Sequence, residues 1–318
     1  MTAAPPPPSW ASPAVAFADV RHGWASGSGG ILGTTDGRTW RVEFRLAAYG
    51  LDAVDAETAW AVTANGSIVR TQDGHTWTAV AGPRVSRVSF ADRRRGIALT
   101  LAQRVVITDN GGSSWRTHRL RMSDVCALGG SLLAARGGSV WRSGDRGRSW
   151  RRVRLLPDRQ GFPIPQLACR DRDAWVVLHE GAAAGTEGYR VYRSLDGGRT
   201  WRAVLASPSK RGLPPISNYA GPLAVVGRGT AVLVGRCDPC GRYEPTATVV
   251  RTTDGGRSFS RWTPFDGYWP YSVSFVDARH GWLLTGDRRA HDAVVWATAT
   301  GGRTWRRVLR SRAIGAPA

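Results

Sequence analysis

The stretch that organises this chain is Ser194-Leu195-Asp196-Gly197-Gly198-Arg199-Thr200-Trp201, because its pattern returns along nearly the whole sequence. Three copies keep its spacing, at 108–115, 143–150 and 252–259. Two copies are one residue shorter, at 34–40 and 71–77, and the last copy occupies 298–305. Asn110 takes the place of the Asp in one copy and Thr300 in another. The chain therefore contains seven repeats of one local motif.

The chemistry of this motif predicts a tight hairpin turn. A carboxylate such as Asp196 at the first corner accepts hydrogen bonds from the backbone N–H groups that follow it, and glycine takes the positive φ that reverses the chain. Strand-like runs flank the turn, at 191–194 before it and at 201–204 after it. The side chain of Trp201 offers a large apolar face for packing against a neighbouring sheet. Each copy is therefore expected to be a β-hairpin that folds on local signals.

The repeated turn resembles the Asp box, or BNR repeat, of sialidases, sortilin-type receptors and photosystem II assembly factors. The resemblance covers nearly the whole chain and takes its specificity from the repetition. In those families the box joins the third and fourth strands of a propeller blade, and its role is structural and not catalytic. The resemblance therefore implies structural roles for the residues at the Asp place, which are Asp36, Asp73, Asn110, Asp145, Asp196, Asp254 and Thr300.

The length of the chain agrees with one closed ring of repeats. Divided by seven, the 318 residues allow about 45 per repeat, the size of a four-stranded propeller blade. We therefore expect an all-β fold, a single seven-bladed β-propeller of four-stranded antiparallel blades with Asp-box hairpins, over residues 14–310. Residues 1–13 are expected to form a Pro-rich disordered tail and residues 311–318 a C-terminal tail. We also expect a monomer without a transmembrane segment, since the sequence has no long uncharged apolar run.

A second signature supports this division into blades. The segment 17–24 matches 275–282, with a looser form at 90–97, and it is assigned to the turn between the first two strands of a blade. His22 and His280 lie in this turn. Their fixed place in a repeat favours a structural role over ligand binding.

The strong positive charge of the chain comes from arginine. The formal net charge is +20, and Lys210 is the only lysine among 44 basic residues. Many of the arginines recur beside the repeat tryptophan, as Arg199 and Arg202 do, where outer strands meet solvent. The pattern favours a solvated surface with a general attraction to acidic surfaces, and no specific nucleic-acid partner is expected.

Four cysteines bear on the cellular compartment. Cys237 and Cys240 have the spacing of a zinc or redox half-site, but no second pair or nearby histidine completes a zinc site, so a local disulfide is favoured. Cys126 and Cys169 stand at similar places in consecutive repeats, and their pairing is left open. Paired cysteines indicate an oxidising compartment, so we expect an exported or cell-envelope protein of a bacterium, with a cytoplasmic location as the alternative because residues 1–13 show no signal-peptide pattern. No metal and no cofactor are expected.

The repeats of the second half are longer than those of the first. Consecutive repeat aromatics are 37, 38 and 35 residues apart as far as Trp150, and then 51, 58 and 46 residues apart. We assign the extra residues to loops on the face opposite the repeat turns, since binding residues gather on loops of rigid scaffolds. Aromatic and arginine side chains suit a protein segment or a carbohydrate as partner. The candidate binding face contains Arg159, Phe162, Arg211, Tyr219, Arg236, Arg242, Tyr243, Tyr268, Trp269, Tyr271 and Arg288.

We predict a non-catalytic binding or scaffold role, with a glycoside hydrolase as the alternative. The Phe-Arg-Ile-Pro motif that a sialidase resemblance implies is not present, because the segment 162–165 reads Phe-Pro-Ile-Pro. A different Asp-box glycosidase requires two carboxylates about 5 to 10 Å apart. The candidates for such a pair are Asp238, Glu244, Asp266, Asp287 and Asp292, and no catalytic residue is assigned.

Overall fold

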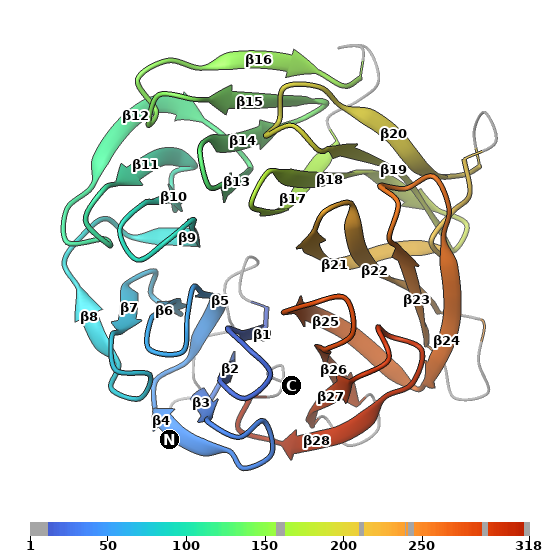
Figure 1. Ribbon diagram of the computed structural model, residues 1–318, viewed down its shortest axis with the longest axis horizontal. Coiled ribbons are helices and arrows are strands. Elements are labelled where there is room, and N and C mark those ends of the chain that lie inside the picture. The colour runs from blue at the N-terminus through green and yellow to red at the C-terminus, as the bar shows by residue number, and fades with distance from the viewer. Residues whose placement is uncertain are drawn as a thin grey trace.

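The computed structural model contains seven four-stranded antiparallel sheets arranged as blades around a common centre (Figure 1). It describes residues 12–156, 163–209, 213–238, 240, 245–287 and 292–314. The predicted all-β, seven-bladed propeller is confirmed, and none of the described residues is helical. In particular, nothing in these ranges forms a helix of the length and apolarity needed to span a membrane.

Each blade consists of four strands that are consecutive in the sequence. Blades one to four contain β1 (Ala14–Phe17), β2 (Gly23–Gly27), β3 (Gly30–Thr34), β4 (Arg41–Phe44), β5 (Ala48–Ala53), β6 (Ala59–Thr63), β7 (Ile68–Thr71), β8 (Thr78–Val80), β9 (Val85–Phe90), β10 (Gly96–Thr100), β11 (Arg104–Thr108), β12 (Arg116–Arg121), β13 (Asp124–Ala127), β14 (Leu132–Arg136), β15 (Ser139–Ser143) and β16 (Arg151–Arg154). Blades five to seven contain β17 (Ile164–Arg170), β18 (Asp173–Ala183), β19 (Thr186–Ser194), β20 (Arg202–Ser207), β21 (Tyr219–Gly227), β22 (Thr230–Cys237), β23 (Thr246–Thr252), β24 (Ser260–Asp266), β25 (Tyr268–Phe275), β26 (Gly281–Asp287), β27 (Ala293–Thr298) and β28 (Arg306–Ser311).

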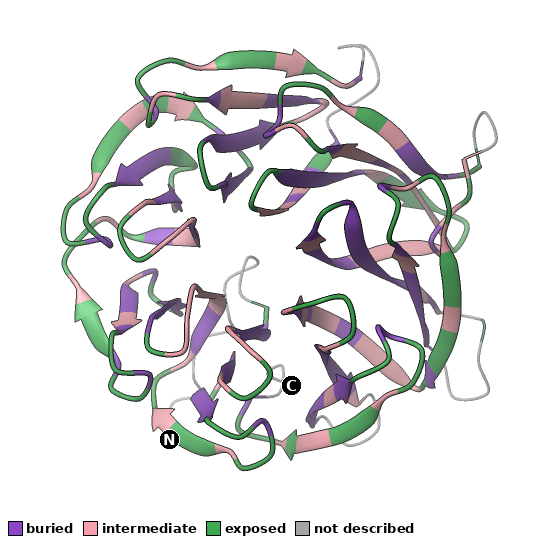
Figure 2. Ribbon diagram, in the orientation of Figure 1, coloured by how far each residue is buried: buried purple, intermediate pink, exposed green. Residues whose placement is uncertain are grey.

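Burial follows the order of the strands within a blade. The second strands carry most of the buried residues, for example throughout β2 and β6, whereas the outer strands, such as β12 and β16, carry exposed residues (Figure 2). The first strand of every blade faces a central channel (Figure 1). Apolar side chains between adjacent blades therefore form the core, which consists of seven clusters around the ring.

The repeated turn joins the third and fourth strand of each blade. In blade five, Asp196 Oδ1 accepts hydrogen bonds from the backbone N–H groups of Arg199 at 2.9 Å and Thr200 at 3.0 Å. Ser194 Oγ accepts the N–H of Gly198 at 2.9 Å, and Gly198 has a φ of +83°, which favours glycine. Burial raises the pKa of Asp196, but the hydrogen bonds from Thr200, Ser194 and Arg199 outweigh it and bring the pKa down to about 2. The carboxylate thus closes the turn in its ionised form.

The second signature fixes contacts between blades. A Cβ at Gly23 would overlap the ring of Phe17, so only glycine allows that ring to lie there. The same ring stacks on Trp282 of blade seven, with ring centroids 3.6 Å apart. Asp19 Oδ1 accepts the N–H of His22 at 2.9 Å, and Asp19 Oδ2 pairs with the His22 imidazole at 2.9 Å. His22 is thus part of the turn, and His280 contacts Asp277 in the equivalent way at 2.8 Å.

The first and last blades meet by packing, without sharing a strand. Ile314 is fully buried in a cluster that contains Val15 and Trp282, and the carbonyl of Ala313 accepts a hydrogen bond from the N–H of Gly29. The residues directly after β28, which the sequence assigned to a tail, therefore lie across the hairpin of blade one. We call the contact between blades seven and one the seam.

Two of the extra segments of blades five to seven lie largely in strands, which corrects the expectation of loops for them, whereas residues 208–218 belong to no strand where the structure describes them. The segment 179–188 belongs mostly to β18 and β19, which pair as far as Ala183 and Thr186. The segment 264–270 forms the end of β24 and the start of β25 around a single residue, Gly267. The reason is that a longer hairpin pairs its own backbone groups, which a loop leaves to solvent. We name the face formed by these extended strand ends the loop face, and the opposite face the turn face.

Candidate functional site

The structure places five of the eleven candidate binding residues on or near the loop face. They are Tyr219 at the start of β21, Arg236 near the end of β22, and Tyr268, Trp269 and Tyr271 in β25. The other six lie outside the described residues: Arg159, Phe162, Arg211, Arg242, Tyr243 and Arg288.

Arg236 is the centre of this group. Its guanidinium carbon lies 3.5 Å from the centre of the Trp269 ring and 4.5 Å from that of Tyr219. Tyr219 is the register partner of Arg236 within blade six, whereas Trp269 comes from blade seven. Arg236 Nε is 2.7 Å from Asp238 Oδ1, and the arginine side chain is 18% exposed. The guanidinium therefore joins two aromatic rings and a carboxylate across a blade boundary. The attraction between a cation and an aromatic ring is stronger where water is excluded.

The two remaining tyrosines act mainly as anchors. Tyr268 packs edge-on against Trp296, with ring centroids 5.1 Å apart. Tyr271 lies over Gly286, where any side chain would overlap its ring, and burial raises the pKa of Tyr271. Tyr271 also lines the central channel and packs at the seam. The sequence grouped these tyrosines with Arg236, but among the candidate residues that the structure describes, only Tyr219 and Trp269 lie against its guanidinium.

Blade five holds the start of β21 in place, through residues that the sequence did not single out as supports. The hydroxyl of Tyr189 accepts hydrogen bonds from the N–H groups of Ile216 at 2.7 Å and Ser217 at 3.2 Å, and donates to the Ser217 carbonyl at 2.8 Å. Glu187 Oε2 accepts the N–H of Ala220 at 2.8 Å, and its Oε1 lies 2.7 Å from His179 Nδ1. The position of Tyr219 is therefore fixed by the long β18–β19 hairpin.

The carboxylates proposed for catalysis are mostly engaged with arginine. Asp287 and Asp292 contact the same guanidinium, that of Arg310, at 2.9 and 2.7 Å. The hydrogen bond from Arg310 lowers the pKa of Asp292. A glycosidase acid needs a raised pKa to hold its proton, so this geometry fits a structural ion pair better. Asp238 pairs with Arg236, Asp266 is an exposed residue of β24, and Glu244 lies outside the described residues.

The central channel, of about 760 Å³, carries a charged group that sequence reasoning missed. Arg87 Nε lies 2.6 Å from Asp124 Oδ1, and Asp124 Oδ2 accepts the N–H of Leu167 in the next blade at 2.6 Å. Asp52 Oδ2 accepts the N–H of Phe90 in the next blade at 2.5 Å. Burial raises the pKa of Asp124 and brings that of Asp52 to about 6. Both carboxylates hold adjacent blades together. The sequence feature that could have identified them is an acidic residue in an otherwise apolar inner strand.

Both cysteine pairs form disulfides. Cys126 and Cys169 join the inner strands of blades four and five, with Cα atoms 6.2 Å apart. Cys237 and Cys240 close the end of β22, with Cα atoms 5.4 Å apart. Within the described ranges, no three His, Cys, Asp or Glu side chains come together in a way that could hold a metal ion.

No protein-family profile matches this chain. A xyloglucanase from Paenibacillus sp. is 25% identical over 202 residues, which are 55% of this chain and 19% of that relative. The chain therefore spans about a fifth of the length of this curated protein.

The fold is similar to several solved propellers. A structure of YCF48 bound to D1 peptide superposes with a TM-score of 0.60 at 14% identity, covering 94% of this chain and 98% of that one. YCF48 from Cyanidioschyzon merolae gives 0.60 at 16% identity, covering 93% and 97%. The GH74 xyloglucanase from Xanthomonas campestris gives 0.62 at 16% identity, covering 92% of this chain and 52% of the enzyme. At these identities the likeness establishes the architecture alone.

Proposed function

We propose that this chain is a non-catalytic binding propeller that engages an extended, acidic protein segment through the loop face of blades five to seven. The observation that carries the proposal is the arrangement of Tyr219, Arg236 and Trp269 at the boundary of blades six and seven. A YCF48 propeller of similar architecture has been solved with a bound D1 peptide, which supports a protein segment as the ligand class.

The physical argument rests on preorganisation. The rings of Tyr219 and Trp269 are half-buried and held by one guanidinium, so little side-chain freedom remains to be lost on binding. The lengthened strands of blades five to seven hold this group on a rigid scaffold. The net charge of +20 raises the rate of encounter with an acidic segment, an effect that weakens with salt.

A peptide-display selection against the folded protein tests the proposal. Peptides selected from a library of extended acidic segments should bind Trp269→Ala and Arg236→Ala at least about tenfold more weakly than the parent, a loss of about 1.4 kcal/mol. Arg202→Ala, which removes an exposed arginine of outer strand β20, is the charge-matched control and should bind like the parent. Equal affinities of all four proteins would reject the loop-face site.

The second candidate is a glycoside hydrolase, which the similarity to a xyloglucanase favours. Its test is turnover of xyloglucan oligosaccharides and aryl glycosides by the purified protein. Activity abolished by Asp287→Asn or Asp292→Asn would replace the binding proposal with this one. Binding of the same sugars without turnover, lost in Trp269→Ala, would instead make the ligand a glycan.

We also infer that the repeat turns are structural Asp boxes and that the protein is exported. The two disulfides support an oxidising compartment, such as the cell envelope of a bacterium. Counting reactive thiols in protein from its native source tests this inference, and four free thiols would contradict it.

A further inference from the structure

On the turn face, an arginine from one blade repeatedly contacts the turn of the next blade. Arg70 Nη1 donates to the carbonyl of Gly111 at 2.9 Å. Arg142 Nε donates to the carbonyl of Gly197 at 2.7 Å. At the equivalent positions of blades five to seven, Arg193 lies beside Gly255 and Arg251 lies beside Gly301. Four of the seven blades therefore place an arginine on the third strand against a glycine of the following turn.

Between blades three and four the two residue types are exchanged. Ile107 stands at the place of the arginine on β11, and Arg146 stands at the place of the glycine in the next turn. Arg146 has a φ of +60°. The other six turns use glycine there, with φ between +68° and +82°, at Gly37, Gly74, Gly111, Gly197, Gly255 and Gly301. A side chain in this left-handed conformation destabilises the turn, and such strain is retained mainly where a function requires the residue.

The contact between blades three and four also lacks the aromatic stack seen elsewhere. Trp60 stacks on Phe90 of the next blade, with ring centroids 3.6 Å apart. Ile97, the register partner of Ile107, occupies the place of the tryptophan, and Ala127 that of the phenylalanine. Ile97, Ala127 and Ile107 are smaller than the tryptophan, phenylalanine and arginine at the equivalent places, and they leave space at the boundary of blades three and four.

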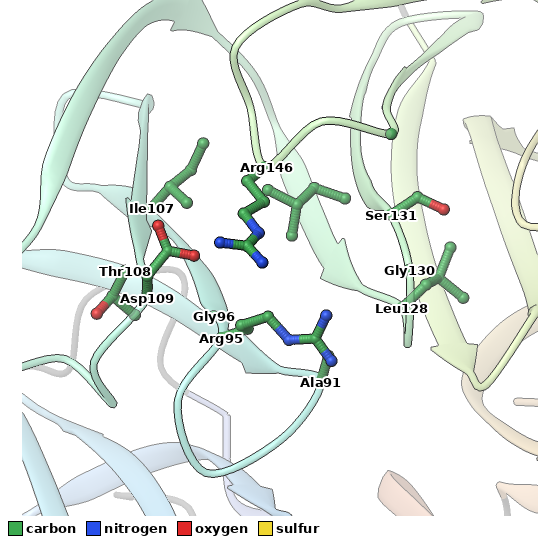
Figure 3. Close-up of a pocket in the computed structure, with 12 residues that line it drawn as sticks. Ala91, Arg95, Gly96, Ile107, Thr108, Asp109, Leu128, Gly130, Ser131 and Arg146 are labelled. Atoms are coloured by element: carbon green, nitrogen blue, oxygen red, sulfur yellow. The ribbon is translucent and has the colours of Figure 1, made fainter.

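That space is a cavity of about 200 Å³ that opens on the turn face (Figure 3). Its apolar wall consists of Ile107, Leu128 and Leu132, all of them buried. Arg146 and Arg95 extend into it from the two blades, as Figure 3 shows. The cavity therefore combines an apolar base with two arginines and one carboxylate, that of Asp109, and such a mixture of apolar and polar groups is the chemistry of a small-ligand pocket.

The charges around the cavity leave one cation without a partner. Arg95 pairs with Asp92 at 2.6 Å, and Asp109 lies 3.8 Å from Arg116. The guanidinium of Arg146 makes no hydrogen bond or ion pair with any residue that the structure describes. Arg146 is thus the group at this cavity available to an anion.

We propose that this cavity binds a small carboxylate carried on a compact apolar body, such as an aromatic acid. The carboxylate accepts hydrogen bonds from the Arg146 guanidinium, whose planar donors match a carboxylate. The apolar body packs against Ile107, Leu128 and Leu132 in place of the missing aromatic stack. The site lies on the turn face and is independent of the loop-face function.

Benzoate is the probe, and methyl-labelled isoleucine is the reporter. The chain has seven isoleucines, so the spectrum is simple: Ile107 lines the cavity, and Ile314 at the seam is the internal reference. We expect a saturable shift of the Ile107 methyl signal with a Kd of about 1 mM, typical of so small a ligand. The Ile314 signal should not move. Benzyl alcohol, the uncharged analogue, should bind at least about tenfold more weakly because it cannot pair with Arg146.

Two variants separate binding from folding. Arg146→Gly restores the residue of the other six turns, so it should raise the melting temperature by about 2 °C while weakening benzoate at least about tenfold. The double variant Ile107→Arg with Arg146→Gly keeps the net charge and fills the cavity in the manner of Arg70, and it should abolish binding. Benzyl alcohol binding as tightly as benzoate, or unchanged benzoate affinity in a folded Arg146→Gly protein, would overturn the proposal.

Discussion

The guanidinium of Arg236 lies over the ring of Trp269, with its carbon 3.5 Å from the ring centre, and so connects blade six to blade seven. Because the pair is half-buried, we expect Arg236→Ala to lower the free energy of unfolding by about 1 to 2 kcal/mol. Arg236→Lys should recover part of the loss, since an ammonium retains charge but does not stack. Chemical denaturation of the three proteins measures the effect, and a loss below the error of the method would contradict a joining role for this contact.

The Asp copies of the repeat turn should matter more than the Thr copy. Asp196 accepts hydrogen bonds through both carboxylate oxygens, from the backbone of Arg199 and from Thr200, whereas Thr300 offers one hydroxyl to the N–H of Thr304. Asp196→Ala should therefore lower the free energy of unfolding by about 1 to 2 kcal/mol and Thr300→Ala by less than about 1 kcal/mol. Thermal melts of both variants compare them directly. Equal shifts would show that the carboxylate adds nothing to the turn.

The depressed pKa of Asp196 predicts a loss of stability in acid. The folded-state pKa of about 2 lies below the ordinary value of 3.8, so its contribution is complete above about pH 4 and disappears as the pH falls towards 2. Asp196→Asn should remove this part of the pH dependence. The measurement is the melting temperature between pH 2 and pH 5, compared for parent and variant; superimposable slopes would be evidence against the assignment.

Asp52 should act in the opposite sense. Burial raises its pKa from 3.8 to about 6, so the folded protein binds a proton in this window that the unfolded chain has released. Its contribution therefore stabilises the fold below about pH 4 and is lost as the pH rises through 6. Asp52→Asn keeps an oxygen for the N–H of Phe90 but cannot titrate, so the variant should lose less stability than the parent between pH 4 and pH 7. Parallel curves of stability against pH for the parent and the variant would refute the raised pKa of Asp52.

The two disulfides should differ in their effect on stability. The bond between Cys126 and Cys169 spans 43 residues and that between Cys237 and Cys240 spans 3. Chain-entropy arguments give a loss of about 4 kcal/mol when the first is replaced by a pair of serines and about 2 kcal/mol for the second. Chemical denaturation of the two variants under non-reducing conditions measures both losses. The same measurement on the parent protein after reduction gives the loss when both disulfides are absent. A larger loss from the short bridge would exclude loop entropy as the cause.

The fold was predictable because its signals are local. Each repeat turn carries its own Asp, Gly and Trp, and seven copies at blade-sized spacing leave one simple architecture. The strand character of 179–188 was missed because its residues show no alternation of polar and apolar side chains, and pairing within a long hairpin stabilises it instead. Tertiary pairing, which local pattern does not encode, decides such segments.

The candidate site was only partly predictable. Composition pointed to the aromatics and arginines of blades five to seven, but the contact between Arg236 and Trp269 depends on the register of two strands in different blades. Asp52 and Asp124 were not predicted as contacts between blades. An isolated acidic residue in an inner strand does not indicate which backbone N–H of the next blade its carboxylate will bind. The exchange between Ile107 and Arg146 is visible in the aligned repeats, yet its meaning needs the knowledge that the two positions face one another.

The seam closes the ring by non-covalent contacts. Val15 and Ile314, almost three hundred positions apart, share one apolar cluster, while no sheet is divided between the two ends of the chain. A peptide linker could therefore join the chain here, and new ends could be opened between two other blades, for instance between β8 and β9, without cutting a sheet. Such a circular permutant should fold to the same ring. When its two ends are pulled apart, the unpermuted chain should separate first at the seam and then unfold blade by blade. The permutant should separate first at a different boundary between blades.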